Sequence, residues 1–167
     1  DPDLQVDRAM VIGNGNVAVD VARMLVLAPE ELAPTDTGDH AIEQFAKSTI
    51  SDVLIAGRRG PLQAAYTNPE LLELGELQIA DVIIDPAEAA LDALSQVDFA
   101  EASKPDQRNV ETVLKYAQRS RTTKPRTVTL RYLLSPLEIR GDGRVEEIVM
   151  VRNRLERSND GSIRAIA

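Results

Sequence analysis

The sequence predicts an α/β domain in which a parallel sheet with crossover helices precedes an antiparallel β-meander. Strand-like and helix-like segments alternate from residue 8 to about residue 95, and a glycine turn joins the first strand to the first helix. β-rich runs dominate after residue 126. A chain of 167 residues is long enough to bury one core, so we expect residues 1–167 to form a single domain.

The first half of the chain predicts strands that are separated by helices. Residues 8–13 predict a short buried strand. Residues 16–27 predict a helix whose apolar face carries four side chains: Val17, Val21, Met24 and Leu25. The next expected elements are a loop at 28–40, a helix at 41–48, a strand at 52–56, a helical turn at 69–74 and a strand at 77–84. This order is typical of a parallel sheet, because parallel strands need crossover connections.

The second half changes character. Residues 86–95 and 105–121 predict helices. β-rich runs then occupy 126–140, 144–156 and 162–166, with GDG and NDG turn signals between them, which indicates an antiparallel β-meander.

Composition excludes several kinds of chemistry. The chain has no Cys, so it offers no disulfide, no thiolate for an iron–sulfur cluster and no catalytic thiol. Its one histidine, His40, makes a zinc site or a histidine-based triad improbable. A net charge of −8 and 3% aromatic residues disfavour nucleic-acid binding, which needs a basic surface or stacking rings. Any redox chemistry must therefore come from a bound organic cofactor.

The chain shows no membrane or export signal. No stretch approaches the ~18–20 apolar residues that a membrane span needs, and the start, DPDLQVDRAM, is acidic and polar, unlike a signal peptide. We therefore expect a cytoplasmic protein. The first residue is not Met, which favours an excised segment of a longer chain.

The sharpest motif is GNGNVA at residues 13–18, a GxGxxA pattern between a strand and a helix. Gly13 lets the chain turn sharply, Gly15 leaves room for a pyrophosphate, and Ala18 lets the helix pack close to the strand. The unpaired N–H groups and the dipole at the helix start favour an anion. The motif predicts a Rossmann-like nucleotide site, and the alternative is a purely structural turn.

Two arginines follow the second strand. An acidic residue at this place holds the ribose 2′-hydroxyl of NAD, whereas a 2′-phosphate needs cations. The sequence offers Arg58 and Arg59 between two glycines, which predicts NADP(H); two solvated surface arginines are the alternative. The distance from Gly13 to Arg58 exceeds the usual ~20–30 residues of the motif, so the segment at 28–48 must fold away from the site.

Together, VIGNGNVAVDVARMLV at 11–26 and GRRGPLQAAYTNPEL at 57–71 resemble the NADPH domain of adrenodoxin-reductase-like ferredoxin–NADP⁺ reductases. The resemblance implies a pyrophosphate loop and a 2′-phosphate clamp at Arg58 and Arg59. It places Glu70 near the ribose, where the alternative is an acidic residue favoured by the helix dipole. The implied pyrophosphate loop comprises Gly13, Asn14, Gly15, Asn16 and Val17.

The same resemblance implies partners outside this chain. In that family the NADPH domain is inserted in an FAD domain, hydride passes from NADPH to FAD, and electrons leave to a ferredoxin-type iron–sulfur protein. This chain has no second glycine fingerprint for FAD, so we expect the isolated domain to be inactive. Lys104, Arg108, Lys115 and Arg119 form a basic stripe that would suit an acidic ferredoxin, with an ordinary solvated face as the alternative.

Other functions stay open at this point. The same pattern would suit another flavoprotein, such as a glutamate synthase small subunit, or a non-catalytic NADP(H) sensor. A methyltransferase also uses a glycine loop, but the arginine pair speaks against it, because methyltransferases usually place an acidic residue there.

Overall fold

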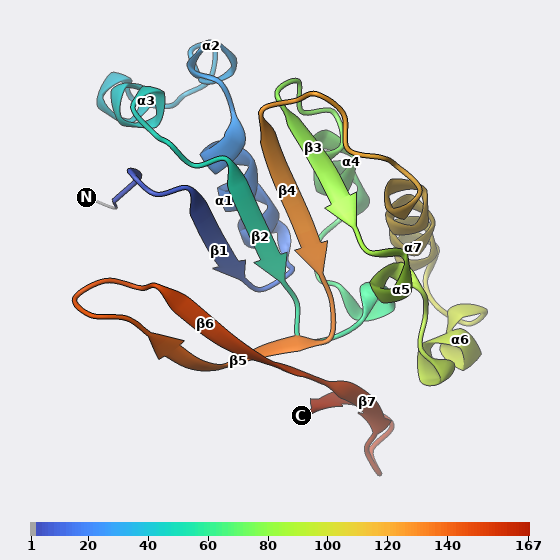
Figure 1. Cartoon of the computed structure of the whole chain (residues 1–167). Coiled ribbons are helices and arrows are strands. Elements are labelled where there is room, and N and C mark those ends of the chain that lie inside the picture. Colours follow the sequence, from blue (N-terminus) through green and yellow to red (C-terminus); the bar gives the residue numbers. More distant parts are fainter. Residues whose placement is uncertain (1–2) are drawn as a thin grey trace.

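The computed structural model describes residues 3–167 and has a four-stranded parallel sheet at its centre, with strand order β1-β2-β4-β3 (Figure 1). The strands are β1 (Arg8–Ile12), β2 (Asp52–Ala56), β3 (Ala80–Ile84) and β4 (Arg126–Arg131). All of them run in one direction, so their carboxyl ends, and the loops that follow, meet at one edge of the sheet.

Helices connect these strands. They are α1 (Asn16–Val26), α2 (Pro29–Leu32), α3 (Asp39–Ala46), the 3₁₀ turn η1 (Pro61–Gln63), α4 (Asn68–Leu74), α5 (Pro86–Ala89), α6 (Ala93–Phe99) and α7 (Lys104–Ala117). Helices α1, α4 and α7 lie on one face of the sheet (Figure 1). The segment that carries α2 and α3 lies at the amino end of the strands, away from the loops at their carboxyl ends (Figure 1). The sequence analysis predicted that this segment folds away from the arginine and glycine motifs.

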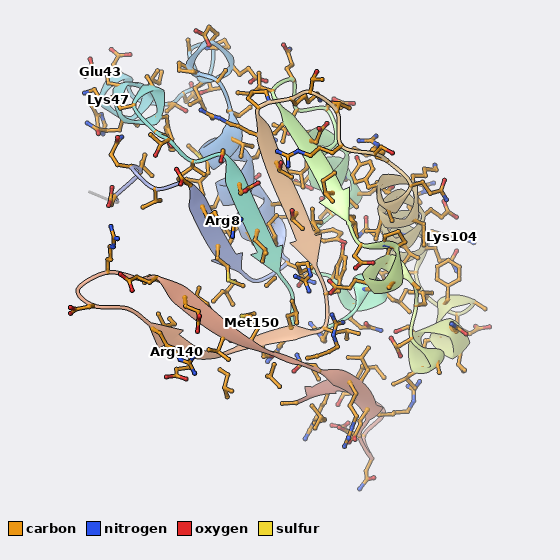
Figure 2. The ribbon with its side chains drawn as sticks, in the orientation of Figure 1. Arg8, Glu43, Lys47, Lys104, Arg140 and Met150 are labelled. Atoms are coloured by element: carbon orange, nitrogen blue, oxygen red, sulfur yellow. The ribbon has the colours of Figure 1, made fainter. Side chains whose placement is uncertain are left out.

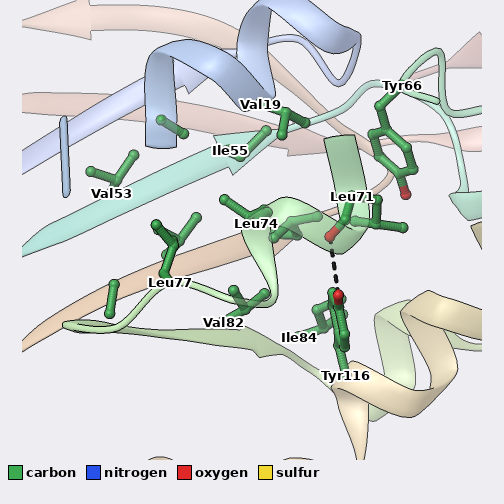
Figure 3. Packing of buried hydrophobic residues seen from close by; sticks show 14 of the residues in the cluster. Val19, Val53, Ile55, Tyr66, Leu71, Leu74, Leu77, Val82, Ile84 and Tyr116 are labelled. Carbon is green, nitrogen blue, oxygen red and sulfur yellow. Dashed lines mark hydrogen bonds between the residues drawn. The ribbon is translucent and has the colours of Figure 1, made fainter. Parts of the chain in front are cut away.

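The core fills the space between the sheet and these three helices. Alternate residues of the strands, such as Val53, Ile55 and Val128, are almost completely buried against α1 and α4. The Tyr116 hydroxyl of α7 donates a hydrogen bond of 3.0 Å to the carbonyl of Leu71 in α4, which ties the two helices together inside the apolar cluster (Figure 3).

Two antiparallel hairpins follow the sheet. Strands β5 (Leu134–Arg140) and β6 (Glu147–Arg152) form the first, and β7 (Arg154–Arg157) and β8 (Ile163–Ile166) form the second. The arrowheads of the parallel strands point toward the β5–β6 hairpin, so this hairpin lies beyond the carboxyl edge of the sheet (Figure 1). The predicted α/β class, with a parallel sheet and antiparallel C-terminal strands, is confirmed.

The predictions for two segments are wrong. Residues 126–140 were predicted to belong to the meander, but the first part of this range is β4, which lies inside the parallel sheet between β2 and β3. The chain leaves that sheet at Leu133, whose φ of 57° breaks the extended run before β5 begins. The helix predicted at 86–95 is two helices, because Asp92 caps a new start by accepting hydrogen bonds from the N–H groups that follow it.

The predicted apolar face of α1 is partly wrong: Leu25 packs against the core, but Val17 and Val21 do not lie in it. Val17 is 77% exposed and Val21 is 42% exposed, while Val19, Ala22 and Val26 are buried. Both sets repeat at helical spacing, so sequence periodicity could not choose between them. Strand β1, predicted to be buried, is only half-buried, whereas β3 at the opposite edge of the sheet is buried.

Within residues 3–167, no helix combines the length and the apolar character that crossing a bilayer requires.

Candidate functional site

The glycine loop lies between β1 and α1 at the carboxyl edge of the sheet. Gly13 has a φ of +130°, a conformation that side-chain-bearing residues rarely adopt, and its N–H donates to the carbonyl of Ala56 at 2.9 Å. Gly15 has an ordinary extended conformation, and an added Cβ would meet Ala65 only at an ordinary contact distance of 3.8 Å. The protein itself therefore needs glycine at 13 but not at 15, as expected if residue 15 is kept small for a ligand.

The start of α1 is open. No side chain caps it and no acidic residue lies in its first turn, so its unpaired N–H groups and its positive dipole end are free to face an anion. Asn16 and Val17 begin the helix here, and Val17 projects into solvent. A hollow of about 490 Å³ lies against this loop. It is lined by Val11, Ile12, Gly13, Gly15, Asn16, Val17, Ala18, Val21 and Ala65.

The arginine loop, residues 57–60, follows β2 and packs directly against the glycine loop. A Cβ on Gly57 would lie 2.4 Å from Nδ2 of Asn14, so any side chain at position 57 would force Asn14 to move. The Nδ2 group of Asn14 is buried and has no hydrogen-bond partner among the described residues. An unpartnered buried donor between the two loops is what a phosphate-bearing ligand would satisfy.

Arg58 and Arg59 are available cations. Arg58 is exposed, Arg59 is half-buried, and neither forms an ion pair within residues 3–167. The loops that follow two neighbouring strands thus bring an open helix start against a loop that carries two arginines without ion-pair partners among the described residues. This arrangement suits a dinucleotide that carries an additional phosphate.

A third segment joins the two loops to α4. The N–H of Ala65 donates to the carbonyl of Asn14 at 3.0 Å, and the N–H of Thr67 donates to Oδ1 of Asn16 at 2.7 Å. Glu70, in the first turn of α4, has a buried carboxylate oxygen, Oε2, with no partner among the described residues. The structure therefore brings Glu70 to a helix that is tied to the glycine loop, and its role toward a ribose stays a prediction.

Two tyrosine hydroxyls form a buried pair behind this segment. Tyr66 and Tyr132 lie 2.8 Å apart, oxygen to oxygen. Burial raises the pKa of Tyr66, an effect that the hydrogen bond with Tyr132 partly offsets, and burial also raises the pKa of Tyr132. Both stay neutral at physiological pH, so the pair supports the core and offers no charge to the site.

A buried carboxylate holds the β5–β6 hairpin to the sheet. Glu88 of α5 accepts two hydrogen bonds of 2.8 Å from Arg131 of β4, one of 2.6 Å from Arg152 of β6, and one of 3.2 Å from the N–H of Tyr132. Burial raises the pKa of Glu88, but these four hydrogen bonds outweigh burial, and the net pKa lies below its ordinary value of 4.5.

Sequence reasoning missed three residues that contact the arginine loop. Leu133, Leu134 and Asn153 lie far along the chain, yet each donates a hydrogen bond to a carbonyl of that loop. The only signal in the sequence was an Asn between two arginines inside a β-rich run, which by itself carries no information about its partner.

The relatives found by comparison with known proteins agree with one another in the activity that their names give. No family model matches the chain. NADPH-ferredoxin reductase FprA of Mycobacterium tuberculosis is 48% identical over 164 residues, which cover 98% of this chain and 36% of that protein. NADPH:adrenodoxin oxidoreductase of Bos taurus is 38% identical over 147 residues, covering 83% of this chain and 29% of that protein.

A solved structure agrees. Mycobacterium tuberculosis FprA in complex with NADPH has a TM-score of 0.92 and 47% identity, and the match covers 99% of this chain and 36% of that one. The chain therefore spans about a third of the length of these relatives. Over nearly its whole length the chain is therefore similar to about a third of these reductases, and the predicted resemblance to adrenodoxin-reductase-like ferredoxin–NADP⁺ reductases is confirmed.

Proposed function

We propose that this chain is the NADPH-binding domain of a ferredoxin–NADP⁺ reductase. One observation carries the proposal: two arginines without carboxylate partners among the described residues lie on a loop that packs against an uncapped helix start. Gly13, Asn14, Gly15, Asn16 and Val17 would hold the diphosphate bridge, mainly through backbone N–H groups.

In this proposal Arg58 and Arg59 would neutralise the 2′-phosphate, and Glu70 would accept a hydrogen bond from a ribose hydroxyl. When bound, NADPH supplies a hydride. The chain's own residues orient the dinucleotide, because a helix start and a pair of cations at different places fix both the direction and the register of a ligand with two separated phosphate groups.

The remaining parts of the proposal concern what lies outside this chain. We place FAD in another part of the same polypeptide, since the relatives are about three times as long as the matched segment. A ferredoxin-type iron–sulfur protein is the proposed electron acceptor, in keeping with the names of the relatives. The same proposal has three further parts. Residues 1–167 form a single domain inserted in the longer polypeptide, this domain is inactive when isolated, and the protein is cytoplasmic.

The basic stripe expected to meet the acceptor is less regular than the sequence indicated. Helix α7 ends at Ala117, so Arg119 lies beyond it and stacks on Tyr116 with 4.1 Å between the guanidinium carbon and the ring centre. Lys104 begins α7 at the outer rim of the molecule, on the opposite side from β1 (Figure 2). Docking through Lys104, Arg108 and Lys115 remains a hypothesis.

Retention on a 2′,5′-ADP resin tests the proposal directly. We expect the chain to bind the resin and to be released by NADPH but not by the same concentration of NADH, because only NADPH carries the 2′-phosphate. Equal release by both nucleotides, or no retention, would contradict it. Binding of S-adenosylmethionine would instead favour a methyltransferase. Within the proposal, the GRRGPLQ run favours a reductase over a glutamate synthase subunit.

A further inference from the structure

The backbone of the arginine loop is held by a corner far along the chain, between β4 and β5. The N–H of Leu134 donates to the carbonyl of Gly57 at 3.0 Å, and the N–H of Leu133 donates to the carbonyl of Arg59 at 3.2 Å. On the other side, the N–H of Gly57 donates to the carbonyl of Arg131 at 2.9 Å. The peptide before Arg58 and the peptide after Arg59 are therefore fixed by backbone contacts.

Asn153 completes this set at Arg58 itself. Its Nδ2 donates to the carbonyl of Arg58 at 2.8 Å and to Oγ of Ser135 at 2.8 Å, and its own N–H donates to the carbonyl of Leu133 at 2.7 Å. Asn153 is 5% exposed, so these bonds are largely sheltered from water. The carbonyls of residues 57, 58 and 59 thus accept hydrogen bonds from Leu134, Asn153 and Leu133, in that order. Only Asn153 donates through its side chain.

The corner that carries these donors is itself strained. Leu133 is the single non-glycine residue with a positive φ among residues 3–167, at 57°. A left-handed conformation is sterically unfavourable for a residue with a side chain, so other contacts must hold it there. The hydrogen bonds to Arg59 and Asn153 are contacts of that kind.

Asn153 lies between β6 and β7, and the last residue of β6 anchors the chain just before it. Arg152 forms an ion pair with buried Glu88, with 2.6 Å between Nη2 and Oε1. Glu88 in turn binds Arg131 at the end of β4. Asn153 is therefore placed by charged contacts to the carboxyl edge of the sheet, and its side chain has little freedom to leave Arg58.

We propose that Asn153 is a positioning residue for 2′-phosphate recognition: it orients the backbone at Arg58 so that the arginine side chains meet the phosphate. This inference rests on the proposed function. It adds a residue from outside the glycine and arginine motifs, one that would touch no ligand atom and would act through Arg58.

Two adenosine probes isolate the effect, because they differ only in the 2′-phosphate. The measurement is the dissociation constant of 5′-AMP divided by that of 2′,5′-ADP, here called the discrimination ratio, obtained by calorimetry on the chain. We expect Asn153→Ala to lower the ratio by about 3- to 10-fold, the effect of losing one hydrogen bond and part of the loop's order. Binding of 5′-AMP should stay nearly unchanged.

A matched control separates positioning from general loss of structure. Asn109 is also buried, at 3% exposure, and its Nδ2 donates to the carbonyl of Tyr66 at 2.9 Å. Asn109→Ala therefore removes the same kind of contact elsewhere, and it should lower thermal stability without lowering the ratio. Ser135→Ala removes the second anchor of the Asn153 amide and should lower the ratio by less than Asn153→Ala does.

The outcomes are distinguishable. A lower ratio in the Asn153 variant with an unchanged ratio in the Asn109 variant supports the inference. A wild-type ratio in Asn153→Ala, beside a reduced ratio in an Arg58→Ala/Arg59→Ala variant, overturns the inference and leaves the proposed function standing. An unchanged ratio in the double arginine variant overturns both. If Asn153→Ala does not fold, Ser135→Ala decides, and a wild-type ratio there overturns the inference.

Discussion

The glycine loop and the arginine loop lie side by side but are built in different ways. The glycine loop has a local origin in Gly13 with its positive φ and in the helix start that follows it, and contacts from Ala56 and Ala65 then hold it in place. The arginine loop takes its shape from residues about 75 to 95 positions away, at Leu133 and Asn153.

This difference has a practical consequence. A motif whose geometry is local can be recognised in a sequence, because the residue types and their spacing determine the backbone conformation. A motif whose geometry is imposed from a distance can be recognised only by its chemistry, here two cations. We therefore expect damage to the first loop to affect every dinucleotide alike, and damage to the second loop to affect NADPH selectively.

The largest effect is expected from removing the cations of the arginine loop. Arg58→Ala together with Arg59→Ala should weaken NADPH binding by about 2–4 kcal/mol, since two charge-assisted contacts to a phosphate are lost from a partly exposed loop. NADH binding should change little. Calorimetric titration with both nucleotides measures this, and an equal loss for NADH would mean that the arginines shape the site without reading the 2′-phosphate.

The next effect concerns the two glycines that look equivalent in sequence. Gly15→Ala should leave thermal stability near wild type, because its Cβ meets Ala65 at 3.8 Å, yet weaken NADPH and NADH alike by about 1–3 kcal/mol through crowding at the diphosphate. Gly57→Ala should instead destabilise the fold itself, because its Cβ would overlap the Asn14 side chain.

Thermal unfolding and nucleotide titration of both glycine variants provide the comparison. Loss of stability in Gly15→Ala without loss of binding would show that the glycine serves the turn alone, the structural alternative to a nucleotide site.

A smaller effect is expected at the charged anchor behind the arginine loop. Glu88→Gln should lower stability at neutral pH by roughly 1–3 kcal/mol, because Arg131 and Arg152 lose a buried ionised partner. The pKa of Glu88 is lowered in the folded state, so its contribution is complete above the ordinary value of 4.5 and is lost as pH falls through the folded pKa.

Chemical denaturation from pH 7 down to pH 3 tests this sign. The difference in unfolding free energy between wild type and Glu88→Gln should shrink below about pH 4.5. A difference that stays constant over this range would mean that the carboxylate's charge does not stabilise the anchor.

The smallest effect is expected at the strained corner. A glycine substitution ordinarily lowers the free energy of unfolding more than an alanine substitution does. At position 133 we expect the reverse, with Leu133→Gly more stable than Leu133→Ala by about 1 kcal/mol, because glycine adopts a positive φ without steric cost. Leu133→Gly and Leu133→Ala lose the same packing, so comparing their melting temperatures isolates the backbone. Leu133→Gly should also keep its preference for 2′,5′-ADP, since the contacts to the arginine loop use backbone atoms.

Much of the fold was predictable from the sequence, and the errors have a common origin. The short strands, α1 and the glycine turn follow from local pattern and spacing. The buried face of α1 was misjudged because two different sets of apolar residues repeat at helical spacing. Packing against the sheet buries Val19, Ala22 and Val26. Strand β4 was assigned to the wrong sheet because a β-rich run does not reveal its pairing partners.

The sequence by itself determined the α/β class, the glycine loop with its open helix start, and the two arginines after the second strand, because each depends on neighbours within a few residues. Only the tertiary structure decided that Gly57 lies against Asn14, that Glu88 holds a hairpin to the sheet, and that Asn153 reaches the carbonyl of Arg58. Those contacts join segments separated by tens of residues, and their partners are set by how the chain packs rather than by any local pattern.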